Sequence, residues 1–490
     1  MKTVLILSRG ARLSATFGHL ARELGRKHRV IVVFRIWNEA TAHDPADWVG
    51  IDNLVSYDLR EETKRRATGD LKARAQEIER KINLTACQSA ANYLLYRRFS
   101  RDYFGTWSGL YDSEREILEE FVGSHSLIAE IFEKHRPDLV FCETPDLISH
   151  RVAQAVALQH GVFTLGFAFN NLFGDGLVNF TFGCNYRNPV LEYFYRNASE
   201  ISDAARAKAD KLAERLARGQ VHEAGYIREY KQTIGGQRAG ALKRVAARVS
   251  SALGVWELVL AGKRALVASR NRRWLNRHLK REIPAGPYVL VSLHYQPEAS
   301  TCLAAPRWVD QDKIVEQLAI NAPAGIRIAV KENPRKFGLR GKDYFAPLKD
   351  FQNVDLLHPL VPNEKLIRNA SAILSITGTV GIEGIALGKK VGILGRPSYD
   401  VFEGARKLDA PEEIFMHLAD PSWKPEAMRD ERRAFLAAMA EATFVFGKPQ
   451  KGDPWPRPED AGPNLARALD GFLAFLDRTQ FKPSQLSPAL

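Results

Sequence analysis

The chain has 490 residues, of which 45% are hydrophobic and 26% charged, and its net charge at pH 7 is +13. This is ordinary globular usage at a length that predicts two domains, and no uncharged apolar run approaches the roughly 20 residues that span a bilayer. The four cysteines have no Cys-x-x-Cys spacing, so neither a disulfide framework nor a zinc site is indicated, and a reducing cytoplasm fits.

The first half of the chain alternates apolar strands with helices. Its N-terminal apolar run is too short for a signal peptide and indicates a first buried strand instead. About residues 61–134 form a polar, helical insertion. This alternation predicts a parallel, doubly wound sheet. Strands are expected within 3–7, 29–34, 137–146 and 161–167, and helices within 16–27 and 152–160.

Three polar residues follow strands of this first half. Arg9 ends the first strand, where it is expected either to bind an anionic group or to cap a neighbouring helix. Glu143 lies in the acidic loop 143–146, and Asp175 lies between two glycines in the loop 170–176. A carboxylate in such a loop is a candidate general base. Gly-Asp-Gly equally serves turn geometry, so both interpretations of Asp175 stand.

Basic residues concentrate in one segment. From Arg228 to Arg281 there are 14 Lys or Arg residues and only two acidic ones. Basic helices with embedded Trp and Leu lie on anionic membrane surfaces, which predicts peripheral contact with the inner membrane. The alternative is a solvated linker whose Trp256 and Trp274 pack on a domain. No nucleic-acid-binding module accompanies the cluster, so nucleic acid is not an expected partner. The other apolar positions at helical spacing are Leu242, Val245, Val249, Leu253 and Leu260.

Three polar motifs in the second half each follow an apolar, β-branched run. The runs are 288–291, 326–330 and 372–374. Because the carboxyl ends of parallel strands converge on one crevice, these motifs predict a ligand site. Its expected polar residues are Gln296, Glu298, Ser300, Thr301, Lys331, Asn333, Thr377 and Thr379, with His358 at the end of a fourth strand, 354–357.

Two of these motifs suggest how an anion is held. Lys331 is expected to neutralise a phosphate or a sugar carboxylate, although a surface ion pair with Glu332 is the alternative. After the third strand, Gly378 and Gly381 permit close backbone approach, and the N–H groups that open the next helix bind phosphate. Glu383 is expected in the first turn of that helix, as an acceptor for ribose hydroxyls. The alternative there is a tight turn with a dipole-stabilising Glu.

Over about residues 286–405 the chain resembles bacterial capsule and surface-polysaccharide biosynthesis proteins. The resemblance rests on Leu293-His-Tyr-Gln-Pro-Glu-Ala-Ser-Thr301, on Lys331-Glu-Asn-Pro334 with Gly338 and Arg340, and on Thr377-Gly-Thr-Val-Gly-Ile-Glu-Gly384 followed by Gly388-Lys389-Lys390-Val391. It implies the two-domain GT-B glycosyltransferase fold, in a family that includes transferases using CMP-Kdo. Relatives usually carry Lys-Glu-His-Pro, so Asn333 replaces a histidine and cannot carry its positive charge.

The resemblance implies an α/β fold of two Rossmann-type, doubly wound domains that face a cleft, with a helical insertion. The expected segments are an acceptor-side domain over 1–225, a basic linker over 226–285, a nucleotide-sugar domain over 286–450, and a C-terminal helix and tail over 451–490. A terminal helix in this fold often crosses back onto the first domain.

The resemblance also implies roles for the candidate residues. Asp175 or Glu143 is the catalytic base, Arg9 binds the acceptor, and the polar residues of the second half, with Gly378, Gly381 and Glu383, bind the donor. The sequence has no pattern of metal ligands, and a single leaving phosphate is stabilised without a divalent ion, so we expect no metal and no cofactor besides the donor, which is CMP-linked by preference.

The sequence thus predicts a glycosyltransferase that moves a sugar, preferably Kdo from CMP-Kdo, to a glycan or glycolipid acceptor of capsule or surface-polysaccharide assembly. Two alternatives stay open. One is an epimerase of the UDP-N-acetylglucosamine 2-epimerase type, which needs no acceptor. The other is an inactive, glycan-binding relative, which the Asn333 replacement keeps under consideration. The expected location is cytoplasmic and peripheral at the inner membrane.

Overall fold

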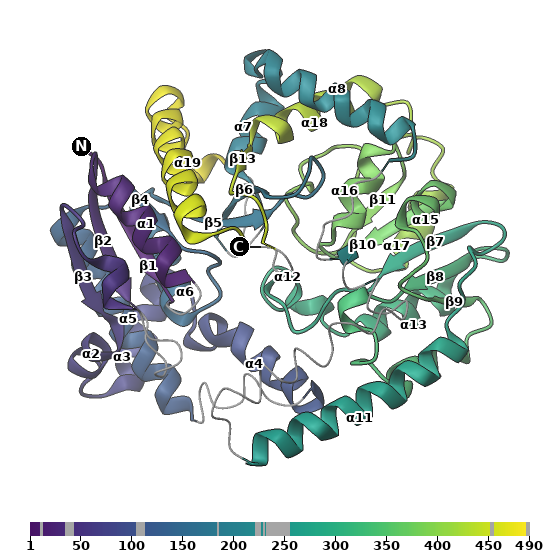
Figure 1. The fold of residues 1–490 in the computed structure, drawn as a ribbon, viewed down its shortest axis with the longest axis horizontal. Coiled ribbons are helices and arrows are strands. Elements are labelled where there is room, and N and C mark those ends of the chain that lie inside the picture. The colour runs from purple at the N-terminus through teal and green to yellow at the C-terminus, as the bar shows by residue number, and fades with distance from the viewer. Residues whose placement is uncertain are drawn as a thin grey trace. The chain divides into compact units, whose positions relative to one another are not determined.

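The structure, a computed structural model, divides the chain into two compact units (Figure 1). Unit 1 comprises Met1–Leu95, Gly109–Glu200 and Glu441–Leu490, and unit 2 comprises Tyr96–Ser108 and Ile201–Ala440. The residues that the structure describes are 1–9, 13–34, 44–103, 113–183, 186–220, 227–228, 231, 255–450 and 455–486.

Among the described residues of unit 1, seven strands form one sheet in the order β13-β6-β5-β4-β1-β2-β3. The strands are β1 (Thr3–Ser8), β2 (Arg29–Phe34), β3 (Leu54–Asp58), β4 (Leu139–Phe141), β5 (Phe163–Phe169), β6 (Leu177–Phe182) and β13 (Thr443–Val445). Strands β1 to β5 are parallel, as predicted. The chain leaves β1 toward β2 and β3 and later returns on its other side to β4, so the switch point of strand order lies between β1 and β4.

The sheet of unit 1 departs from the predicted parallel arrangement at one edge. Strand β6 runs antiparallel to β5, and β13 runs antiparallel to β6. The loop 170–176 between β5 and β6 is too short for a parallel crossover, so it closes a hairpin.

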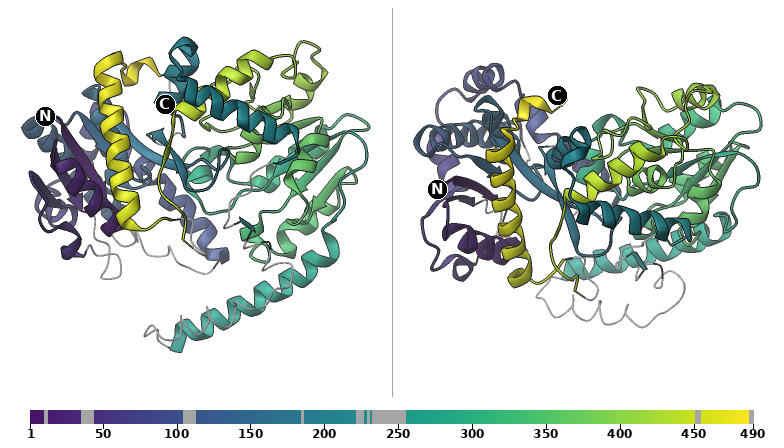
Figure 2. Two further views of the ribbon diagram at one scale, coloured as in Figure 1. Left: turned by 45° about the horizontal axis from the view of Figure 1, so that its top comes forward. Right: turned by 90° about the horizontal axis from the view of Figure 1, so that it is seen from above.

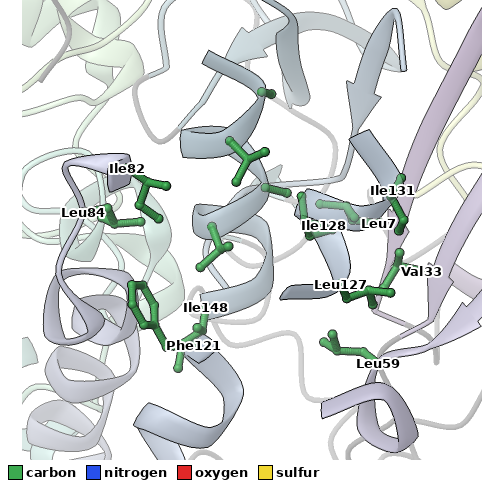
Figure 3. Packing of buried hydrophobic residues seen from close by; sticks show 14 of the residues in the cluster. Leu7, Val33, Leu59, Ile82, Leu84, Phe121, Leu127, Ile128, Ile131 and Ile148 are labelled. Atoms are coloured by element: carbon green, nitrogen blue, oxygen red, sulfur yellow. The ribbon is translucent and has the colours of Figure 1, made fainter. Parts of the chain in front are cut away.

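Helices cover both faces of this sheet. Alternate residues of β1 point in opposite directions, and Leu5 and Leu7 pack with α5 and α6 in one apolar cluster (Figure 3). On the other face α1 packs along α19, which lie side by side in Figures 1 and 2. The helices of unit 1 are α1 (Ser14–Gly25), α2 (Leu59–Arg66), α3 (Leu71–Ile82), α5 (Glu114–His135), α6 (Ile148–Gln159), α7 (Pro189–Arg196) and α19 (Pro458–Thr479), with α4 (Ala86–Tyr103) divided between the units; 3-10 helices are η3 (Pro45–Trp48), η4 (Ala198–Glu200) and η7 (Pro483–Gln485).

The described strands of unit 2 form a parallel six-stranded sheet in the order β12-β11-β10-β7-β8-β9. The strands are β7 (Tyr288–Ser292), β8 (Arg327–Lys331), β9 (Val354–Leu357), β10 (Ala372–Ser375), β11 (Val391–Ile393) and β12 (Arg406–Lys407). They are short apolar runs, as parallel strands covered on both faces should be. Here the switch point of strand order lies between β7 and β10.

Helices also flank both faces of the second sheet. Val289 and Leu374 pack with α13 and α17, whereas Ile373 on the opposite face meets Gly384 of α16. The helices of unit 2 are α8 (Asp203–Ala217), α11 (Val255–His278), α12 (Ala299–Cys302), α13 (Gln311–Asn321), α14 (Lys342–Lys349), α15 (Asn363–Asn369), α16 (Thr379–Ala386), α17 (Glu413–Ala419) and α18 (Arg429–Glu441), with 3-10 helices η5 (Pro306–Trp308) and η6 (Pro334–Lys336).

The α/β class is therefore confirmed, with a doubly wound sheet in each unit and a helical insertion, α2 to α5, in the first. The unit boundary differs from the expected domain boundary at α8. Helix α8 belongs to unit 2, where Arg433 pairs with Asp210 at 2.7 Å, and α19 belongs to unit 1. No helix in the described parts of the chain is long and apolar enough to cross a membrane.

Candidate functional site

The first and third motifs meet at the switch point of unit 2. His294 follows β7 and Thr377 follows β10, and the Nε2 atom of His294 accepts a hydrogen bond from the Thr377 N–H at 3.4 Å. The Thr377 hydroxyl donates to the Ser300 carbonyl at 2.8 Å. His294 belongs to the first motif but was not among the predicted site residues. Its signal was its position directly after a strand that neighbours β10.

His294 is a neutral imidazole in this setting. Burial, and then the nearby Arg340 guanidinium, lower the pKa of His294 to about 4. Because Nε2 accepts the Thr377 N–H, the ring proton lies on Nδ1. His294 therefore fixes the start of the β10–α16 loop without adding a charge.

The loop that opens α16 is held by two hydroxyl groups. Ser375 Oγ accepts from the Gly378 N–H at 3.1 Å, and the Tyr399 hydroxyl donates to the Gly378 carbonyl at 2.6 Å. The N–H groups of Thr379 and Val380 form no hydrogen bond with any described residue. These two groups at a helix N-terminus are suited to an anion.

Two residues of the third motif, Gly381 and Glu383, have other surroundings than the sequence predicted. A Cβ on Gly381 would lie 2.4 Å from the Tyr399 hydroxyl oxygen, so this glycine makes room for the Tyr399 ring. Glu383 is the fifth residue of α16, and the first turn holds no acidic residue, so its expected first-turn position is wrong. The helix starts only at Thr379, because the backbone of Gly378 is extended. Glu383 lies one turn deeper, partly exposed.

Buried contacts organise the second motif. Lys331 is buried, and its Nζ donates to the Asn363 side chain. Glu332 does not form the alternative surface pair with Lys331. It is buried and pairs with Arg340 at 2.6 Å, and Arg340 also donates to the His294 carbonyl. Arg340 thus joins the loops after β7 and β8.

Asn333 caps a turn. Its Oδ1 atom accepts from the Arg335 N–H at 3.0 Å and so begins η6. A short amide side chain suits this turn. The residue in the histidine position therefore has a local structural contact of its own.

A mixed-charge group surrounds Tyr295. The Arg335 guanidinium carbon lies 4.3 Å and the Lys336 Nζ 4.6 Å from the centre of its ring. Burial, and then Arg340, lower the pKa of Lys336 to about 8. Burial also raises the pKa of Glu298, whose Oε2 accepts from the Ser300 hydroxyl at 2.7 Å. Cationic and carboxyl groups thus lie together beside the first motif.

Three predicted donor residues have internal partners. Gln296 is buried, and its Nε2 donates to the Val309 carbonyl at 2.6 Å. The Thr301 hydroxyl donates to the Glu298 carbonyl at 3.2 Å. His358 accepts from the Leu360 N–H and contacts Asn276 of α11 at 3.1 Å, and burial lowers its pKa to about 4.

In unit 1, Arg9 and Glu143 meet at the switch point between β1 and β4. Arg9 Nε donates to Glu143 at 2.9 Å, and its Nη1 donates to both oxygens of Asp146, at 3.0 and 3.1 Å. The partners of Arg9 in these contacts are therefore carboxylates of the loop after β4.

Asp175 is exposed in the hairpin turn between β5 and β6. Gly176 has φ +74°, and a Cβ there would lie 2.1 Å from the Gly447 carbonyl oxygen. The glycine after Asp175 is thus required by the turn, in accord with the turn interpretation, and the role of Asp175 itself stays a prediction.

Part of the basic segment lies outside the described residues, namely 229–230 and 232–254, together with the side chains of 255–261. This includes the six apolar positions from Leu242 to Leu260. In the described part of α11, Trp274 packs against the apolar cluster of unit 2 and stacks on His278, with ring centres 4.1 Å apart. For Trp274, the structure therefore agrees with the alternative that this side chain packs on a domain.

Helix α11 also holds the loop after η6. The Asn271 side chain donates to the Gly338 carbonyl at 3.1 Å, and Arg272 Nε donates to the Phe337 carbonyl at 3.4 Å. Gly338 has φ +90°, and a Cβ there would lie 2.5 Å from the Arg272 side chain. The loop that carries Arg340 is thus attached to α11.

Within the described residues, no three His, Cys, Asp or Glu side chains are arranged to hold a metal ion.

Residues 256–447 match the profile of a family described as "Capsule polysaccharide biosynthesis protein". This match confirms the resemblance that the motifs indicate over residues 286–405. No curated protein matches the chain.

Solved structures with some likeness include two of Thermosulfurimonas dismutans KpsC. One, titled beta Kdo 2,7 transferase, is 12% identical, covers 77% of this chain and 96% of that one, and has a TM-score of 0.35. The other, titled beta Kdo 2,4 transferase, is 14% identical and has a TM-score of 0.37. The match covers 69% of this chain and 94% of the KpsC chain. A UDP-GlcNAc 2-epimerase from Neisseria meningitidis bound to UDP-GlcNAc is 13% identical and has a TM-score of 0.25. The match covers 90% of this chain and 97% of the epimerase chain.

Proposed function

We propose that this chain, whose residues 256–447 match capsule polysaccharide biosynthesis proteins, is a glycosyltransferase that moves a sugar from a nucleotide donor to a capsule or surface-polysaccharide acceptor. The observation that carries the proposal is the contact between His294 and Thr377 at the β7–β10 switch point, next to the two N–H groups that open α16. Open α/β sheets bind ligands at such a point.

The proposed donor is a nucleoside monophosphate sugar, with CMP-Kdo preferred from the family resemblance. Its single phosphate accepts hydrogen bonds from the N–H groups of Thr379 and Val380, and the dipole of α16 adds to the attraction. Such a site stabilises the leaving phosphate by backbone donors, so the proposed reaction uses no metal and no other cofactor. Glu383 remains the proposed contact for the ribose.

A keto-acid sugar adds a carboxylate that also requires a partner. Arg335 and Lys336 are two cations that lie over the ring of Tyr295 and so neighbour the first motif. Their positions support this part of the proposal. Lys331 is a less direct candidate for binding the sugar carboxylate, since its Nζ already donates to the Asn363 side chain.

The base that deprotonates the acceptor hydroxyl is proposed to be Glu143 or Asp175, in an inverting transfer. Arg9 is proposed to act at the acceptor through Glu143 and Asp146, whose two carboxylates outnumber its single charge. The proposed acceptor is a glycan or glycolipid, and a peripheral location at the inner membrane belongs to the same proposal.

One observation favours a second candidate, an inactive relative. Asn333 is uncharged and caps η6, so the charge that a histidine can supply is missing. If the site binds nucleotide but transfers no sugar, and Asn333→His restores transfer, this candidate is correct.

The first experiment measures thermal stabilisation of the purified chain by CMP, UDP, GDP and ADP. A nucleotide at about 100 times its Kd stabilises the native state by roughly 2.7 kcal/mol. Selective stabilisation by CMP supports the proposal, a UDP response favours a hexosamine transferase or an epimerase, and no response to any of the four contradicts a donor site.

The variant that tests the phosphate contact is Thr379→Pro. Thr379 is the first residue of α16, where proline is tolerated, and the extended Gly378 before it is compatible with proline. The change removes one N–H donor, so CMP should bind about 10- to 100-fold more weakly, as expected for the roughly 1.5–3 kcal/mol of a hydrogen bond to a charged group. Thr379→Ala keeps the N–H and is the matched control. Equal CMP affinities of Thr379→Pro and Thr379→Ala would show that the phosphate does not bind at the Thr379 N–H.

A further inference from the structure

Helix α11 presents two different faces. Ala268 and Leu275 of this helix, and Leu279 directly after it, are buried on the unit 2 side. The residues at 263, 266, 267, 270, 273 and 277 share another face by their helical spacing, and the structure leaves all six exposed. The second set is here called the outer face of α11, and it consists of Lys263, Leu266, Val267, Arg270, Arg273 and Arg277.

The outer face is strongly cationic. No acidic residue occurs between Glu257 and Glu282 in the sequence. Within the described residues, none of the four cations of this face takes part in an ion pair. The face is therefore positively charged without internal compensation.

The outer face is also apolar at its centre. Leu266 is 72% and Val267 38% exposed, between Lys263 and Arg270. A bilayer with anionic headgroups offers both charge for the cations and an apolar boundary for the two aliphatic side chains. Nucleic acids offer the charge alone, and no exposed aromatic ring on this face is available to stack on bases.

We propose that the outer face of α11 binds the surface of a membrane rich in anionic lipids, with Leu266 and Val267 entering the headgroup boundary. Trp274, for which the sequence left both membrane contact and packing on a domain open, packs on unit 2. This inference gives the proposed peripheral location a specific surface. It does not require glycosyl transfer, since vesicle binding is measured without a nucleotide sugar.

The experiment is co-sedimentation of the full chain with vesicles of phosphatidylcholine alone and of phosphatidylcholine mixed with phosphatidylglycerol. Binding should occur only to the anionic vesicles and weaken with added salt. The variant Arg270→Gln/Arg273→Gln/Arg277→Gln should bind roughly 100-fold more weakly, because each basic residue near such a surface contributes about 1 kcal/mol.

Two controls separate the explanations. Lys208→Gln/Lys211→Gln/Arg218→Gln removes the same charge from exposed positions of α8 and its C-cap, in the same unit, and should leave binding unchanged. Leu266→Ser/Val267→Ser keeps the charge and should also weaken binding to vesicles. Equal losses in the α8 and α11 triple variants would overturn the proposal, as would binding to an oligonucleotide or an acidic glycan with none to anionic vesicles. The thermal midpoint of each variant, measured without nucleotide, checks that the chain is folded. CMP binding is measured in a separate experiment and tests the donor site only.

Discussion

Arg340 and Glu332 form an ion pair in which neither side chain is more than 1% exposed, and the same guanidinium donates to the carbonyl of His294. One side chain thus fixes the loops after β7 and β8. A buried guanidinium with these acceptors holds both loops in a single arrangement before any ligand arrives.

Arg340→Met should destabilise the protein by about 3–5 kcal/mol, because it leaves the Glu332 carboxylate buried without its partner. The free energy of unfolding from urea titration measures this loss. The double variant Glu332→Gln/Arg340→Met removes the stranded charge and should recover part of the stability. A double variant as unstable as Arg340→Met would show that the ion pair is not the cause.

Tyr399→Phe should weaken nucleotide binding while the ring continues to pack on Gly381. The change deletes the hydroxyl that donates to the Gly378 carbonyl and contacts Ser375 at 2.8 Å, so the start of α16 loses its support. Stability should fall by about 1–3 kcal/mol, since buried polar partners are left unsatisfied. Tyr288→Phe is the matched control, because its buried hydroxyl donates to the Leu366 carbonyl at 2.7 Å in the same unit. Calorimetric titration with CMP should show weaker binding for Tyr399→Phe than for Tyr288→Phe. An equal loss of CMP affinity in both variants would contradict a positioning role for Tyr399.

Gly462→Ala should destabilise unit 1. A Cβ there would lie 2.4 Å from the Cβ of His19 and 2.7 Å from the Thr16 carbonyl oxygen, so α1 and α19 would have to separate. Overpacking of this kind costs about 1–3 kcal/mol. Gly471 lies on the same helix with nothing within 4 Å of its added Cβ, and Gly471→Ala should stabilise α19 by about 1 kcal/mol. Thermal midpoints that move in the same direction for both variants would refute the close helix contact.

Mild acid should reduce stability through His294. Its pKa is lowered from 6.5 to about 4 by burial and by Arg340, so between these values the unfolded chain binds more protons than the native state. Stability due to this group is therefore complete above pH 6.5 and is lost as the pH falls toward 4, by roughly 2 kcal/mol at pH 5.

The check is the pH dependence of unfolding in His294→Gln, which should be shallower between pH 7 and 5 than in the parent chain. His160→Gln makes the same replacement at an exposed position and serves as the reference. An unchanged slope in His294→Gln would mean that another group is responsible.

The sequence predicted four of the six described strands of unit 2, β7 to β10, and the meeting of their carboxyl ends, because each apolar run is followed at once by polar residues. Ser300 and Thr377 were expected near one another and are in contact. The partners that hold them were harder to predict. Arg340 lies 46 residues from His294 in the chain, and Tyr399 lies 21 from Gly378, and neither spacing has a periodic signal.

Burial also limited the site prediction. Gln296 and Thr301 are polar residues in a strand-end motif, yet their side chains bond to the neighbouring backbone. In unit 1, β13 pairs with β6 across more than 260 residues of sequence, with Thr443 opposite Asn179, and no local pattern indicates such a partner. Local periodicity therefore gave the elements, while pairing and burial depend on contacts distant in the sequence.

Helix α11 has 24 residues and so is a rod about 36 Å long, and its inner side is bonded to the loop of Phe337 and Gly338 that leads into Arg340. If occupancy of the outer face favours one position of this rod, it also favours one position of the loops at the switch point. Thermodynamic linkage then requires reciprocity. The factor by which anionic vesicles tighten nucleotide binding must equal the factor by which the nucleotide tightens binding to vesicles, so the two ligands of unit 2 would report on each other.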